Sequence, residues 1–102
     1  MITTDEIIEV NKRLGGHLRS DSSLRFAESY AKGKKSEYRK ASVFVRALVV
    51  DHPFTDANKR TALYVIERLI GVNSNDMAEA VIRIAKKNIT SLPKIDKILR
   101  QR

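Results

Sequence analysis

Apolar residues recur at intervals of three and four along most of the chain, which is the period of helices that bury one face. Six segments have this pattern, and we predict a helix in each of them. They lie close to residues 3–14, 24–33, 37–50, 57–71, 74–87 and 91–99. The pattern therefore predicts an all-α fold of about six helices.

Several predicted helix ends carry residues suited to capping. Thr3 and Glu6 have the spacing of a capping box at the start of the first segment. The run Ser74-Asn75-Asp76 offers cap side chains to the fifth segment, and Pro93 suits the first turn of the last one. Gly71 is placed to end the fourth segment.

The third segment is the most apolar one and has two readings. Its valines over residues 43–50 would also fit a buried strand. However, the chain has no second strand-like run with which such a strand could pair. We therefore predict a helix that buries Ala41, Phe44, Val45 and Leu48 and turns Arg39, Ser42 and Arg46 outward.

Length and composition indicate one folded domain over residues 1–102. Hydrophobic residues make up 42% of the chain and charged residues 31%, which is a folded rather than a disordered composition. The absence of cysteine excludes disulfides and thiolate metal sites. We detect no internal repeat and no linker-like stretch.

The chain carries no recognisable targeting or membrane segment. Residues 1–6 are polar and do not resemble a signal peptide. The longest apolar stretch, residues 43–50, contains Arg46 and falls far short of the roughly 20 residues that cross a bilayer. We therefore expect a cytoplasmic protein that does not span a membrane.

Lys and Arg outnumber Asp and Glu by 20 to 12, which gives a formal net charge of +8. Clustered cations bind nucleic acid by releasing counterions from the phosphate backbone. Here the cations are spread along the chain, and the aromatic residues do not alternate with them. A solvated basic surface is therefore the simpler interpretation.

The chemistry is concentrated at residues 52–60, between two apolar helices. Free N–H groups and the dipole at a helix start suit phosphate oxygens, and we place such a site at Ala57, Asn58, Lys59 and Arg60. A carboxylate beside phosphates can hold Mg²⁺, which is the role we predict for Asp56.

Two further residues of this run have predicted roles. Histidine exchanges protons near neutral pH, so His52 can act as the general base towards a hydroxyl. Phe54 is predicted to point into the core and to anchor the loop. Taken singly, Asp56 could be only an N-cap, His52 a structural histidine, and Lys59 and Arg60 a solvated helix face.

Residues 52–60 read His-Pro-Phe-Thr-Asp-Ala-Asn-Lys-Arg. This run resembles the signature of the Fic/Doc family, which is His-x-Phe-x-(Asp or Glu)-(Gly or Ala)-Asn-(Gly or Lys)-Arg, and it agrees at every specified position. The resemblance implies that His52 is the general base, that Asp56 binds Mg²⁺, and that Asn58 and Arg60 hold phosphates. It also implies ATP or another nucleoside triphosphate as co-substrate, in a compact helical fold with a small flap.

Two positions favour the Doc branch of this family. Members that transfer AMP typically have Gly where Lys59 stands and Arg where Leu63 stands. Doc-like members resemble kinases and transfer the γ-phosphoryl group instead, so Lys59 would contact the phosphates. The resemblance thus implies a toxin that phosphorylates a Ser or Thr hydroxyl of a target such as a translation elongation factor.

The resemblance also suggests partners and alternatives. The polar segment Gly15 to Ser23 is the candidate flap that docks a target by strand addition. A cognate antitoxin is implied because the chain lacks the inhibitory motif Ser/Thr-x-x-x-Glu-(Gly or Asn). Nucleic acid and membrane are not required. Two alternatives stay open, namely AMP transfer to a protein hydroxyl and a non-catalytic basic helical module that binds nucleic acid.

Overall fold

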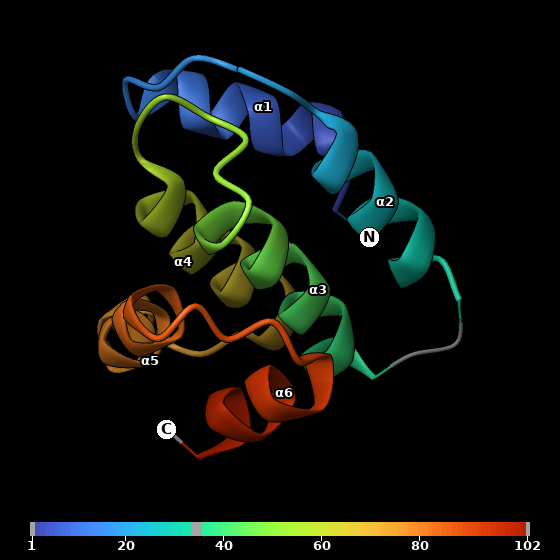
Figure 1. Ribbon diagram of the computed structural model, residues 1–102, viewed down its shortest axis with the longest axis vertical. Helices are drawn as coiled ribbons and strands as arrows, with labels where there is room; N and C mark the ends of the chain where they lie inside the picture. The colour runs from blue at the N-terminus through green and yellow to red at the C-terminus, as the bar shows by residue number, and fades with distance from the viewer. Residues whose placement is uncertain (1, 34–35, 102) are drawn as a thin grey trace.

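Six α-helices make up the described residues, 2–33 and 36–101, of the computed structural model (Figure 1). They are α1 (Thr4–Arg13), α2 (Ser22–Ala31), α3 (Glu37–Val49), α4 (Asn58–Ile70), α5 (Ser74–Lys86) and α6 (Leu92–Arg100). The predicted all-α fold of about six helices is confirmed. Within the described residues, the only isolated β-bridge is between Leu18 and Phe54.

α3 is the central helix of the molecule. It packs against α2, α4, α5 and α6, and it buries apolar residues around most of its circumference. The alternative of a strand over residues 43–50 is therefore wrong. No helix in the described part of the chain is both long enough and apolar enough to cross a membrane.

The predicted outward position of one α3 residue, Ser42, is wrong. Ser42 is fully buried, and its hydroxyl donates a hydrogen bond to the Tyr38 carbonyl at 2.7 Å. Because α3 is enclosed by other helices, it has no broad polar side. Arg39 and Arg46 are only half-buried.

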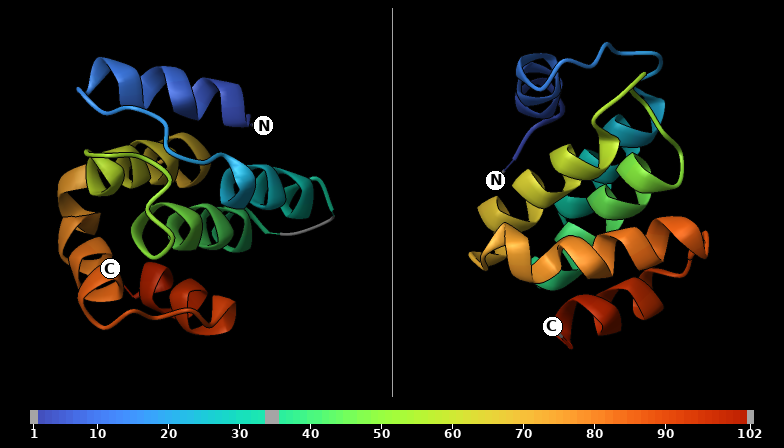
Figure 2. Two further views of the ribbon diagram at one scale, coloured as in Figure 1. Left: turned by 45° about the horizontal axis from the view of Figure 1, so that its top comes forward. Right: turned by 90° about the vertical axis from the view of Figure 1, so that its left-hand side faces the viewer.

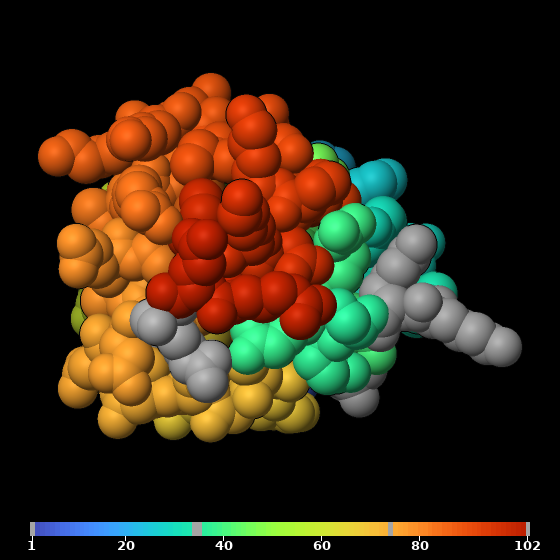
Figure 3. All heavy atoms as spheres, turned by 90° about the horizontal axis from the view of Figure 1, so that it is seen from below, coloured from blue at the N-terminus to red at the C-terminus, as the bar shows by residue number. Residues whose placement is uncertain are grey.

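The other helices are arranged on both sides of a layer formed by α2, α3 and α4 (Figure 2). α1 lies on one side of this layer, and α5 and α6 lie on the other, where they form the face seen in Figure 3. Buried apolar residues from all six helices meet in one cluster, to which α5 and α6 contribute Met77, Val81, Ile84, Ile95 and Leu99.

The helix ends follow the expected cap chemistry at most positions. The Thr3 side chain accepts a hydrogen bond from Glu6 N–H at the start of α1. Ser91 caps α6 in the same way, with Pro93 in its first turn. The cap of α5 is Asn73 rather than a residue of the run 74–76. Several neighbouring residues there have cap chemistry, so the sequence alone leaves the choice open.

A charged cluster ties α1 to α4. Glu6 accepts hydrogen bonds from the Tyr64 hydroxyl at 2.6 Å and from two nitrogens of Arg68 at 3.1 and 3.3 Å. The hydrogen bond from Tyr64, together with the Arg68 guanidinium, outweighs burial and lowers the pKa of Glu6. This cluster holds α1 in place over the helix that begins at the candidate site.

Candidate active site at the start of α4

The loop between α3 and α4 ends in a left-handed turn at Ala57. This residue has φ 62° and serves as the N-cap of α4. A left-handed conformation costs a residue with a Cβ atom about 1 to 2 kcal/mol, a cost that glycine does not have. Ala57 is also only 8% exposed, so a side chain at this position must be small. Asp56 is not the N-cap, which removes the simplest structural interpretation of that residue.

Asn58 closes the loop through its side chain. Its Nδ2 donates to the Phe54 carbonyl at 3.0 Å, and its Oδ1 accepts from Phe54 N–H at 3.2 Å. Phe54 itself is only 1% exposed and anchors the loop in the core. The Asn58 side chain is thus occupied within the loop, and what Asn58 can offer a phosphate is its backbone N–H.

The first turn of α4 presents free N–H groups. The first helical hydrogen bond runs from Thr61 N–H to the Ala57 carbonyl, at 2.9 Å. The Ala57 methyl group cannot accept hydrogen bonds from the three N–H groups that precede Thr61. Those groups belong to Asn58, Lys59 and Arg60. They border a depression of about 260 Å³, lined by His52, Thr55, Asp56, Ala57, Asn58, Lys59 and Arg60. The depression has the dipole and the donors of an anion site.

The two cations of this turn differ in their contacts. Lys59 is exposed at the depression. Arg60 is also exposed, and its Nη2 donates to the Leu14 carbonyl at the end of α1, at 3.1 Å. Because a guanidinium carries five N–H donors, Arg60 keeps others for a phosphate while this bond holds the side chain in place.

The orientation of His52 leaves one ring nitrogen free. His52 has φ 51°, and its Nε2 lies 2.9 Å from the Val49 carbonyl oxygen. A carbonyl oxygen can only accept a hydrogen bond, so Nε2 carries a hydrogen, and in the neutral ring the lone pair is then on Nδ1. Since His52 is exposed, Nδ1 is available as a proton acceptor beside the depression.

Asp56 is suited to share a metal ion with a bound phosphate. Its Oδ1 accepts a hydrogen bond from Ala57 N–H at 2.7 Å, and the side chain is exposed at the depression. In the described part of the chain, no three His, Cys, Asp or Glu residues cluster as a metal site. One carboxylate is nevertheless the usual protein share of a Mg²⁺ ion that is also bound by phosphates and water.

The loop is supported by three residues that were not among the predicted site residues, namely Asn11, Gly16 and Thr61. Asn11 of α1 is fully buried and donates to the Asp56 carbonyl at 2.9 Å and to Thr61 Oγ1 at 3.1 Å. A Cβ atom on Gly16 would lie 2.6 Å from the same carbonyl, so only glycine fits there. The sequence contains one indication of the role of Asn11, because this polar residue occupies a position on the apolar face of its helix, between Ile7 and Leu14.

The predicted flap pairs with the loop through its backbone. Thr55 N–H donates to the His17 carbonyl at 2.9 Å, and Arg19 N–H donates to the Pro53 carbonyl at 2.7 Å. His17 N–H also donates to Thr55 Oγ1 at 3.1 Å. The segment ends earlier than predicted because α2 already begins at Ser22. One edge of this segment is thus occupied by the loop itself.

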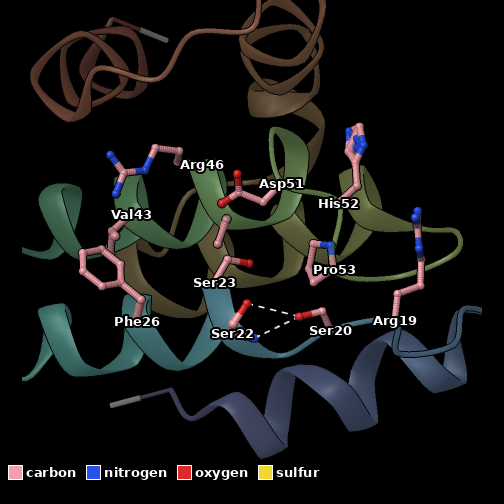
Figure 4. Close-up of a pocket in the computed structure, with 11 residues that line it drawn as sticks. Arg19, Ser20, Ser22, Ser23, Phe26, Val43, Arg46, Asp51, His52 and Pro53 are labelled. Carbon is pink, nitrogen blue, oxygen red and sulfur yellow. Dashed lines mark hydrogen bonds between the residues drawn. The ribbon is translucent and has the colours of Figure 1, made fainter.

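A second, larger hollow of about 590 Å³ lies between α2, α3 and the same loop (Figure 4). Phe26 and Arg46 lie at one end of it, and Arg19, Pro53 and His52 at the other. Asp51 and the serines at 22 and 23 lie between these ends. His52 is the residue that borders both hollows.

Comparison with known proteins agrees with this geometry. The model of the Fic/DOC family matches residues 2–70, which contain α1 to α4 and every site residue described above. No curated protein and no solved structure gave a match to the chain. Since the family model covers more than half of the chain and includes the whole loop with its supporting residues, this protein belongs to the Fic/Doc family.

Proposed function

We propose that this protein is a Doc-like phosphotransferase that moves the γ-phosphoryl group of ATP, or of another nucleoside triphosphate, to a Ser or Thr hydroxyl of a target protein. Fic/Doc proteins are generally transferases that act on protein hydroxyls. The observation that carries the proposal is the placement of His52. His52, whose Nδ1 is free of the Val49 carbonyl, lines a depression together with the uncapped first turn of α4, so a base and an anion site adjoin.

The reaction balances with these groups. Nδ1 of His52 takes the proton of the target hydroxyl, and the hydroxyl oxygen forms a bond to the γ-phosphorus. The bond from that phosphorus to the bridging oxygen breaks, and the nucleoside diphosphate leaves with the electron pair. The backbone N–H groups at Asn58 to Arg60 and the Lys59 and Arg60 side chains neutralise the charge on the phosphoryl oxygens.

Asp56 is the residue that would hold Mg²⁺, through the carboxylate oxygen that Ala57 N–H does not occupy. When bound, this ion supplies charge neutralisation and orientation to the phosphates. Asn11 and Gly16 keep the Asp56 backbone at the depression.

Transfer of the γ-phosphoryl group rather than of AMP is supported by Lys59 and Leu63. Lys59 adds a flexible cation at the depression, where AMP-transferring members typically have Gly. Leu63, one turn further along α4, is an apolar half-buried residue and offers no second cation there. We expect the activity in the cytoplasm, where ATP and translation factors occur, with a cognate antitoxin as its control.

The test uses lysate of the encoding organism with Mg²⁺ and ATP labelled at either the α or the γ position. We expect γ label on a protein band, with at least a hundredfold loss in His52→Ala, because general-base catalysis contributes about 10² to 10⁴. Lys59→Ala should also lower the activity, by weakening the binding of ATP. Its matched control is Lys94→Ala, which changes an exposed lysine in the first turn of α6.

Each other outcome contradicts a defined part of the proposal. Label from the α position would establish AMP transfer. Label that persists in His52→Ala would remove the general-base role. If no band is labelled and the protein binds nucleic acid with a steep salt dependence, the non-catalytic binding module is correct.

A further inference from the structure

The larger hollow meets the phosphate depression at His52 and at no other lining residue. This arrangement suits a two-substrate reaction, because the base must reach the acceptor hydroxyl while the donor phosphates lie next to it. With the phosphates in the depression at α4, the acceptor can approach His52 from the hollow between α2 and α3. We call this hollow, as lined in Figure 4, the acceptor groove.

Charge makes the acceptor groove attractive to a carboxylate. Arg19 and Arg46 line it, and neither forms an ion pair with a carboxylate of the described residues, whereas Arg25, Arg39, Arg68 and Arg100 all do. Asp51 is the one acidic side chain along the groove. The two guanidiniums therefore outnumber it, and a guanidinium is well matched to a carboxylate partner.

The end of the groove away from His52 offers an apolar contact. Phe26 is 56% exposed, and the Arg46 guanidinium lies 6.0 Å from the centre of its ring. Arg46 also donates to the Thr90 carbonyl at 3.2 Å, which helps to fix its position. An exposed aromatic ring beside a fixed cation is typical of surfaces that bind peptide side chains.

We propose that the acceptor groove binds the target segment itself, as an acidic peptide that carries the acceptor Ser or Thr at His52. A carboxylate of the peptide pairs with Arg19 or Arg46, and an apolar side chain packs on Phe26. This inference rests on the proposed function, because it assigns the acceptor of that reaction.

The experiment measures binding of short rhodamine-labelled peptides in which a central threonine is flanked by glutamates, glutamines or lysines. The variants are Arg19→Glu and the matched control Arg83→Glu. Arg83 is exposed on α5, outside the groove, and forms no ion pair with the described residues. Both substitutions change the net charge equally, so any difference between them belongs to the groove.

We expect the glutamate peptide to bind tighter than the other two. We also expect Arg19→Glu to weaken its binding about tenfold or more beyond any loss in Arg83→Glu, because a charge-assisted hydrogen bond is removed. Equal losses in the two variants would overturn the inference, since only net charge would then matter. A loss of ATP binding in Arg19→Glu would overturn it as well, because the groove would then hold the nucleotide.

Peptide binding does not require turnover, so the two proposals can fail separately. If lysate proteins take no label but the glutamate peptide binds as expected, the phosphotransferase function is wrong, and the groove is a site for acidic peptides that are not phosphorylated. If γ label is transferred but Arg19→Glu changes neither peptide binding nor the KM for the labelled protein, the groove assignment is wrong.

Discussion

Asn11 holds the loop from a distant part of the chain. It is 45 positions away from Asp56 in the sequence, yet its amide donates to the Asp56 carbonyl and to Thr61 Oγ1. Thr61 in turn donates to the Ala57 carbonyl at 2.7 Å. A single buried side chain thus fixes both the loop and the first turn of α4.

Replacing Asn11 should therefore destabilise the protein. Asn11→Ala removes the donor of both hydrogen bonds and leaves a cavity at a fully buried position, which we expect to lower the free energy of unfolding by about 2 to 3 kcal/mol. Asn11→Asp keeps the shape but turns a carboxylate towards an accepting oxygen, so its loss should be larger. Urea denaturation at neutral pH measures both variants.

The control for this prediction is Asn75→Ala, because Asn75 is exposed in the first turn of α5. We expect it to change the unfolding free energy by less than about 0.5 kcal/mol. An Asn11→Ala variant as stable as this control would show that the two hydrogen bonds are not needed to hold the loop.

At the scale of elements, the contact between α1 and α4 places the supporting residues over the site. Glu6 is the acceptor that joins the two helices, through Tyr64 and Arg68. Its lowered pKa means that the folded state favours the charged form more than the unfolded chain does. The stabilisation is therefore present above the ordinary glutamate pKa and is lost as the pH falls through the lower folded-state value.

Glu6→Gln should be less stable than the natural protein at neutral pH, by about 1 to 2 kcal/mol, because the charged acceptor is removed. The difference should shrink as the pH falls below about 4, where the natural Glu6 also takes up a proton. Thermal unfolding followed by circular dichroism across this pH range measures it.

Glu9→Gln is the matched control, since Glu9 is exposed on the same helix and has no ion pair with the described residues. It should leave stability nearly unchanged at every pH. If Glu6→Gln destabilised the protein equally at pH 7 and pH 3, the stabilisation would not come from the ionised carboxylate, and this prediction would be wrong.

At the scale of the whole molecule, the core extends beyond the part that the family model matches. That match ends at residue 70, but Met77, Val81, Ile84, Ile95 and Leu99 are at most 1% exposed and belong to the same cluster as α3 and α4. A central helix that is apolar on most sides needs all of these neighbours.

A chain that ends at Gly71 should therefore not fold on its own. Removing α5 and α6 exposes the apolar surface of α3 and α4, and the lost burial exceeds the few kcal/mol by which small domains are stable. We expect a non-cooperative thermal transition by circular dichroism and poorly dispersed amide NMR signals. A cooperative transition near the temperature of the full chain would contradict this.

The helices could be predicted because each one depends on a pattern within its own segment. Burial and side-chain contacts could not be predicted where they depend on other segments of the chain. The pattern of α3 predicts a surface helix with Ser42 on its polar side, whereas the enclosing helices bury Ser42 completely. The side-chain contacts of Asn58 with the Phe54 backbone were also beyond prediction, because they depend on the left-handed turn at Ala57.

The helical fold and the chemical groups of residues 52–60 follow from the sequence, because periodicity and a contiguous run of side chains are local properties of the chain. Three features depend on tertiary packing: Asn11 supports Asp56, residues 17–20 pair with the loop, and a groove opens between α2 and α3 beside His52. An apolar stripe specifies which face of a helix is buried, but it does not specify which helix covers that face. That choice comes from packing between segments that are far apart in the sequence.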